Sequence, residues 1–148
     1  MTKKQSIFRK ITAIIFAMAV AASLFTLVVS ATSYTSTLYI GSPDGYVKGA
    51  TRSYAAGKHE VDLRVDKINQ LITGNETYTM TTKLQKPAPS AGGSPTTMGT
   101  HGPYTYKDLK TYYLPVKKES IAASSYYYEF TGSTYGSLSS GYTIMHTY

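Results

Sequence analysis

The acidic side chains of HEVDLRVD, residues 59–66, come closest in this chain to a catalytic or cation-binding pattern. Glu60, Asp62 and Asp66 fall on one face if this stretch is a strand, because side chains alternate along a strand. Two carboxylates on one face can bind a cation or act as a general acid and base. Arg64 lies on the same face between them, so we expect a solvated, charge-compensated surface instead of a site.

The other residues with catalytic chemistry are scattered along the chain. His59, His101 and His146 lack the spacing to one another and to acidic residues that marks a zinc site. No G-x-S-x-G nucleophile motif occurs, and GSTYG and GSLSSG, which depart from it, are typical of turns. We therefore expect solvent-facing histidines, no metal, no cofactor and no enzymatic activity.

Tyrosine is the residue type that stands out, with fifteen copies and no tryptophan. All fifteen follow residue 31, where Leu, Ile, Val and Phe together number only 17, so tyrosine must fill much of any core. In SSYYYEF, Tyr126 and Tyr128 share one strand face, and we expect both in the core together with Tyr142 and Tyr148. The candidates for a binding surface are Tyr127, Tyr135, Tyr112 and Tyr113, and only one of the last two can face outward because they are adjacent.

The periodicity around these residues is that of β-strands. Residues 77–84, TYTMTTKL, place apolar or β-forming side chains at every second position, and residues 59–66 alternate apolar and charged side chains. Further strands are expected at 34–40 and 46–54, on either side of a Ser-Pro-Asp-Gly turn. The remaining strands are expected in the tyrosine-rich segments after residue 103, with GSLSSG as a turn before the last one.

Two interpretations of residues 59–73 stay open. A strand that ends in a tight hairpin at Gly74-Asn75 fits the alternation, and a short helix capped by Gly74 fits the 3.6-residue spacing of several apolar positions. Leu63 interrupts the apolar stripe of the helix, so the strand is favoured.

Residues 86–103, KPAPSAGGSPTTMGTHGP, hold four prolines and four glycines in eighteen residues. This composition predicts a long mobile loop or a linker between two halves, and the loop is favoured since neither half alone has enough apolar residues for its own core. Several short strands and no convincing helix after residue 31 indicate a small antiparallel β-sandwich, immunoglobulin-like or similar, over residues 32–148.

The first thirty-one residues differ in character from the rest. Four basic residues within the first ten precede an uncharged run over residues 11–31, which ends in Val-Ser-Ala. This pattern predicts a signal peptide over residues 1–31 that is cleaved on export, with an uncleaved membrane-anchoring hydrophobic helix as the alternative. Both place residues 32–148 outside the membrane, which the chain then contacts only through residues 11–31.

The net charge limits the classes of binding partner, and the cysteine content indicates the kind of source. Beyond residue 31, eleven Lys and Arg face eight Asp and Glu, a net charge of +3 without any long basic cluster. This argues against nucleic acid and permits weak attraction to an anionic cell wall or membrane. The absence of cysteine from an exported chain favours a Gram-positive bacterial source.

The segment ASSYYYEF, residues 123–130, resembles the aromatic C-terminal strand of the lactococcin-like bacteriocins. These proteins are small β-sandwiches that interfere with cell-wall synthesis, so the resemblance implies an antibacterial activity. It covers eight residues, and the chain departs from the family in lacking tryptophan, in its longer exported part and in residues 86–103.

We therefore expect a secreted, non-enzymatic β-sandwich that binds cell-wall or envelope components at a bacterial surface. The alternative is a bacteriocin-like antibacterial protein that targets the cell envelope of competitors.

Overall fold

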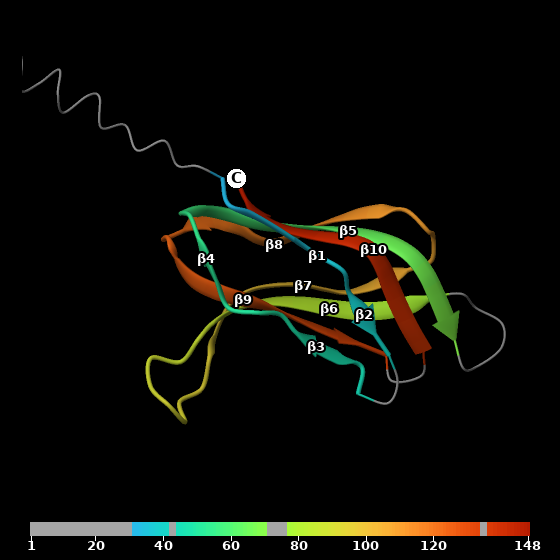
Figure 1. Cartoon of the computed structure of the whole chain (residues 1–148), viewed down its shortest axis with the longest axis horizontal. Helices are drawn as coiled ribbons and strands as arrows, with labels where there is room; N and C mark the ends of the chain where they lie inside the picture. Colours follow the sequence, from blue (N-terminus) through green and yellow to red (C-terminus); the bar gives the residue numbers. More distant parts are fainter. Residues whose placement is uncertain (1–30, 42–43, 71–76, 134–135) are drawn as a thin grey trace, which may run out of the picture.

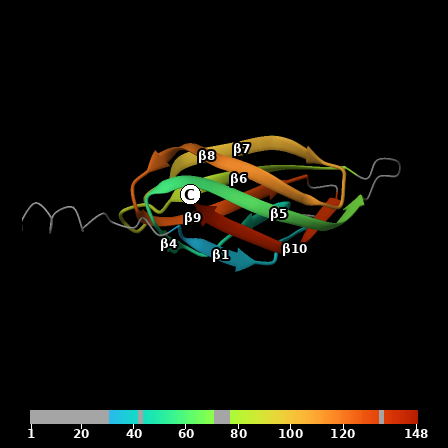
Figure 2. The same cartoon turned by 90° about the horizontal axis from the view of Figure 1, so that it is seen from above.

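Two antiparallel sheets pack face to face in the computed structural model, which describes residues 31–41, 44–70, 77–133 and 136–148 (Figures 1 and 2). The first sheet has the order β1 (Ser33–Ser36), β10 (Gly136–Thr147), β5 (Gly57–Gln70) and β8 (Thr111–Ile121), and β2 (Tyr39–Ile40) also pairs with β10. The second has the order β3 (Tyr46–Lys48), β9 (Ser124–Gly132), β6 (Tyr78–Lys86) and β7 (Thr96–Tyr106), and β4 (Arg52–Tyr54) also pairs with β9. The expected all-β sandwich is confirmed.

The expected hydrophobic helix lies at residues 1–30, outside the part of the chain that the structure describes, and it stays a prediction. Among the described residues, none forms a helix with the length and apolar character needed to span a bilayer.

Residues 57–70 form one strand, so the strand interpretation of this region is confirmed and the helix is wrong up to Gln70. The expected hairpin between this strand and the next is wrong. β5 pairs with β10 and β8, whereas β6 belongs to the other sheet, where it pairs with β7 and β9. The chain therefore passes from one sheet to the other between β5 and β6, and the turn expected at Gly74-Asn75 lies outside the described residues.

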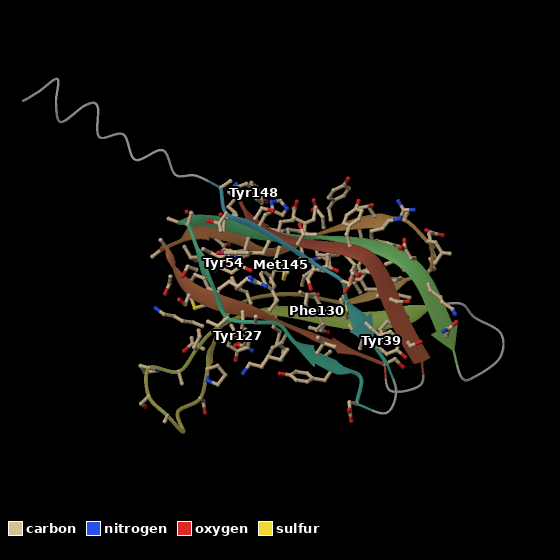
Figure 3. All side chains as sticks on the ribbon, in the orientation of Figure 1. Tyr39, Tyr54, Tyr127, Phe130, Met145 and Tyr148 are labelled. Carbon is tan, nitrogen blue, oxygen red and sulfur yellow. The ribbon has the colours of Figure 1, made fainter. Side chains whose placement is uncertain are left out.

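The core lies between the sheets, and tyrosine supplies much of it. β6 buries alternate side chains, as residues 77–84 predicted, and Tyr78, Met80, Thr82 and Leu84 are all buried. Figure 3 shows Tyr54, Phe130 and Met145 between the two sheets. The other buried tyrosines of the core are Tyr106, Tyr112, Tyr126 and Tyr128, and the last two were expected there.

β10 contradicts the expected positions of its two tyrosines. GSLSSG is the first half of this strand and not a turn, and there Leu138 and Ser140 face the core. Pairing with β5 is irregular on both sides of Ser140, where Asp66 of β5 and Gly141 of β10 are each skipped in the register, and the alternation along β10 reverses at Gly141. Tyr142 and Tyr148, which we expected in the core, therefore lie outside it. The second half of the strand buries Thr143, Met145 and Thr147 instead.

The loop expected over residues 86–103 is wrong from Thr96 onward, where β7 begins, and only residues 87–95 join β6 to β7. β7 is the last strand of its sheet, and an edge strand tolerates proline because one of its sides carries no hydrogen-bond ladder. Gly99 has a packing role as well. A Cβ there would overlap the carbonyl oxygen of Val116 on β8, so glycine permits the two sheets to approach closely along this edge.

Candidate functional site

Three neighbouring strands of the first sheet bring together outward-pointing side chains that are far apart in the sequence. On β5, Glu60 lies opposite His146 of β10, and Asp62 lies opposite Tyr113 of β8. Paired residues on neighbouring strands point to the same side of a sheet. We call this side the outer face, and its residues are Lys58, Glu60, Asp62, Arg64, Thr111, Tyr113, Pro115, Tyr142, Ile144, His146 and Tyr148.

The middle of the outer face holds a cluster of one imidazole and two carboxylates. The Nε2 atom of His146 lies 3.3 Å from Oδ1 of Asp62 and 3.8 Å from Oε1 of Glu60. All three groups offer a metal-ligating atom, and these atoms lie within 4.8 Å of one another. The side chains are mostly covered, with 21–23% of their surface exposed. We call this group the Glu60/Asp62/His146 cluster.

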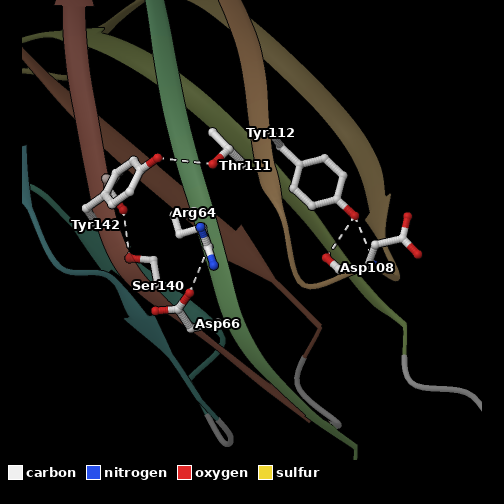
Figure 4. A network of polar contacts seen from close by, with 8 residues as sticks. Arg64, Asp66, Asp108, Thr111, Tyr112, Ser140 and Tyr142 are labelled. Carbon is white, nitrogen blue, oxygen red and sulfur yellow. Dashed lines mark hydrogen bonds and ion pairs between the residues drawn. The ribbon is translucent and has the colours of Figure 1, made fainter.

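Arg64 does not neutralise the cluster, although the sequence suggested that it would. Its Nε atom donates a hydrogen bond of 3.1 Å to Oδ1 of Asp66, on the side away from Asp62 along the strand (Figure 4). Within the described part of the chain, no lysine or arginine forms an ion pair with Glu60 or Asp62. Of the three carboxylates that we expected Arg64 to compensate, it therefore pairs with Asp66 alone.

Exposed tyrosine rings surround the cluster. Tyr113 is 68% exposed, Tyr148 is 56% exposed and Tyr142 is 37% exposed. The Tyr142 hydroxyl lies 3.1 Å from Oγ1 of Thr111, so the two residues bridge β10 and β8 across the intervening β5 (Figure 4). Tyr142 and Tyr148 are six residues apart, which corresponds to about 20 Å along a strand. The outer face thus combines an aromatic surface with a polar centre.

Of the four tyrosines proposed for binding, Tyr113 is the one that the structure places on the outer face. Its neighbour Tyr112 is buried, as the alternation requires for one member of the pair. The Tyr112 hydroxyl accepts a hydrogen bond of 3.0 Å from the Asp108 amide and donates one of 3.1 Å to the Asp108 carbonyl (Figure 4). Tyr112 is therefore a structural residue, and Tyr135 lies outside the described residues.

Tyr127 points away from the core, as expected, but its predicted exposure is wrong because only 3% of it is exposed. The Lys48 ammonium lies 4.4 Å from the centre of its ring, in a cation–π contact across β3 and β9. Long lysine side chains cover apolar surface while their charge stays in water. Figure 3 shows Tyr127 at the second sheet and Tyr148 at the first sheet, on the other side of the molecule. The two rings therefore cannot belong to one binding surface.

His59 is fully buried, which corrects the expectation that all histidines face solvent. Its Nδ1 atom lies 3.1 Å from the Tyr128 hydroxyl, and its ring packs against Tyr54 and Tyr126. Burial is the main cause that lowers the pKa of His59 to about 4, and the charge of His146 lowers it further. The position follows the inward alternation of Val61, so the sequence carried this signal. Without access to solvent, His59 serves the core and not a surface reaction.

A separate pocket of about 230 Å³ opens between the β1–β2 and β3–β4 edges of the two sheets. Its lining combines apolar side chains with the cations of Lys48 and Arg52, and among the described residues it contains neither a carboxylate nor a histidine. The outer face is the stronger candidate site because it gathers titratable groups and exposed rings together.

Comparisons of the chain with models of protein families, with curated proteins and with solved structures found no match.

Proposed function

We propose that the protein is an extracellular binding module that holds glycans of the bacterial cell envelope on the outer face. The observation that carries this proposal is the arrangement of Tyr113, Tyr142 and Tyr148 around the Glu60/Asp62/His146 cluster on one sheet face. Apolar faces of sugar rings pack on aromatic side chains, and sugar hydroxyls hydrogen-bond to carboxylates and imidazoles. The outer face of the sheet presents both kinds of contact side by side.

Features of the sequence support the same proposal. The basic segment and apolar run of residues 1–31 are typical of export, which would place residues 32–148 outside the cell. A net charge of +3 on that part favours approach to an anionic wall. Tyrosine also suits recognition because it offers a large rigid contact area at low entropic cost.

Retention on purified Gram-positive cell walls tests the proposal. Full-length protein in a mild detergent is incubated with sedimented walls, and the bound fraction is measured for the wild type and for Tyr113→Ala combined with Tyr148→Ala. We expect the double variant to bind at least about tenfold more weakly, because each lost ring removes about 1 kcal/mol or more of contact energy. Tyr46→Ala is the matched control, since Tyr46 is an exposed tyrosine on the second sheet.

Three outcomes have defined meanings. Equal retention of the double variant and the wild type removes the outer face from the proposal. A wild type that binds neither walls nor soluble envelope glycans contradicts the function itself. Growth of Gram-positive cells is followed in parallel, since the bacteriocin-like alternative predicts inhibition in addition to binding.

A further inference from the structure

We propose that the Glu60/Asp62/His146 cluster is a binding site for a divalent transition-metal ion of the Zn²⁺ type. This inference concerns metal chemistry and does not depend on glycan binding. It rests on the charge, the geometry and the donor types of the three side chains.

The charge of the cluster calls for a cation. Glu60 and Asp62 are mostly covered, and carboxylates that share a covered site repel each other unless a cation compensates them. Among the described residues, His146 is their only ion-pair partner, and an imidazole carries a positive charge only when it is protonated. With a neutral imidazole the cluster has a formal charge of −2, which one divalent ion balances.

The geometry of the cluster fits a small ion. In a tetrahedral zinc site with bonds of 2.0–2.2 Å, neighbouring ligand atoms lie about 3.4 Å apart. His146 Nε2 lies 3.3 Å from its contact on Asp62 and 3.8 Å from that on Glu60. The ligand atoms of Glu60 and Asp62 lie within 4.8 Å of each other, so side-chain rotations that move these atoms by about 1 Å bring all three to bonding distance. Glu60 and His146 sit directly opposite each other on paired strands, so the backbone already holds the ligands together.

The donor types select the metal. One imidazole nitrogen with two carboxylate oxygens suits zinc, whereas calcium and magnesium prefer sites made of oxygen alone. Three protein ligands leave the fourth tetrahedral position for water or for an oxygen of an external ligand. Exposed tyrosines lie on the same outer face as the cluster.

Calorimetric titration of the full-length protein with ZnCl₂ at pH 7.5, in detergent and without wall material, tests the site. We expect one saturable equivalent of zinc. Glu60→Gln, Asp62→Asn and His146→Asn should each weaken binding by more than about tenfold, because each removes a ligand. Asp66→Asn is the matched control: it removes a carboxylate from the same strand, but one that pairs with Arg64 and lies outside the cluster. We expect its affinity for zinc to equal that of the wild type.

Nuclear magnetic resonance of the wild type keeps the proposal testable if a variant fails to fold. Zinc should shift the ring signals of His146 and leave those of the buried His59 largely unchanged. The proposal is overturned if zinc does not bind saturably, if the cluster variants bind as tightly as Asp66→Asn, or if His101 responds instead of His146. Calcium binding with the same affinity in His146→Asn as in the wild type would also overturn the proposal, because it would indicate a site made of oxygen ligands alone. Wall retention is a separate measurement, so failure of the zinc proposal would not affect the proposal of glycan binding, and the reverse also holds.

Discussion

A buried histidine sets the pH response at the scale of single residues. Burial lowers the pKa of His59 to about 4. In an unfolded chain, histidine has its ordinary pKa of about 6.5. Between these values the unfolded chain binds a proton that the folded protein excludes. The contribution of His59 to stability is therefore complete above about pH 6.5 and is lost as the pH falls towards 4.

We expect this loss to reach about 3 kcal/mol in the free energy of unfolding. Urea denaturation at pH 7, 5.5 and 4 measures it, and in His59→Gln the decrease with falling pH should be smaller by that amount. His101, whose pKa burial also lowers, contributes a decrease of the same sign that persists in the variant. Equal decreases in His59→Gln and the wild type would contradict this account.

Single residues also show what the sequence could predict. Alternation correctly placed Tyr126 and Tyr128 in the core, because their strand pairs regularly with β6. It also placed Tyr127 on the opposite side, but the burial of that ring depends on Lys48 from another strand. A strand pattern reports which way a side chain points, and it does not report what covers the side chain.

An irregularity in the pairing of β10 with β5, which includes Gly141, determines which side of β10 faces solvent. Gly141 separates a first half that buries Leu138 from a second half that buries Met145. Without the bulge, Tyr142, Ile144 and His146 would face the core, and the outer face would lose one strand of its site. Glycine and serine suggested a turn at this position, and periodicity alone could not distinguish a turn from a bulge within a strand.

Deletion of Gly141 tests the role of the bulge. We expect the deletion to destabilise the fold by at least about 3 kcal/mol, because it exchanges the buried side of the second half of β10 with its outer side. Thermal unfolding followed by circular dichroism measures the change. Deletion of Ser94, an exposed residue between β6 and β7, is the control and should lower stability much less. A similar loss for both deletions would show that the bulge is not what orients β10.

The composition of residues 86–103 was misleading for a related physical reason. Proline and glycine disfavour a central strand, but β7 is an edge strand, and its Gly99 lies where the Val116 carbonyl of β8 leaves no room for a Cβ. Whether a strand lies at an edge depends on long-range pairing, which the local sequence does not encode.

The two outer sides of the whole molecule differ in how their polar groups are satisfied. On the second sheet, Glu129 accepts hydrogen bonds of 2.9 Å from both Tyr46 and Gln85, and Gln85 in turn accepts one of 3.0 Å from Thr97. These groups satisfy one another. On the first sheet, the carboxylates of the Glu60/Asp62/His146 cluster have His146 as their one ion-pair partner among the residues that the structure describes. This asymmetry favours the first sheet as the side that binds.

The sequence predicted the sandwich but not this site. Alternation in residues 59–66 and in the last strand identified the outward residues of each strand separately. The pairing of β10 with β5, which brings His146 to Glu60 and Asp62, joins segments that are far apart in the sequence, and no spacing rule connects them. Because this pairing is not visible in the sequence, the spacing of His146 gave no sign that it belongs to a cluster.

The central claim is that the outer face is where the protein binds envelope glycans. Amide chemical shifts of the labelled protein, recorded during titration with soluble peptidoglycan fragments, test it most directly. The account predicts shift changes that cluster on β5, β8 and β10 around Asp62, Tyr113 and Tyr148, with little change on β3, β9, β6 and β7. Shift changes confined to the second sheet, or none at saturating fragment concentrations, would contradict it.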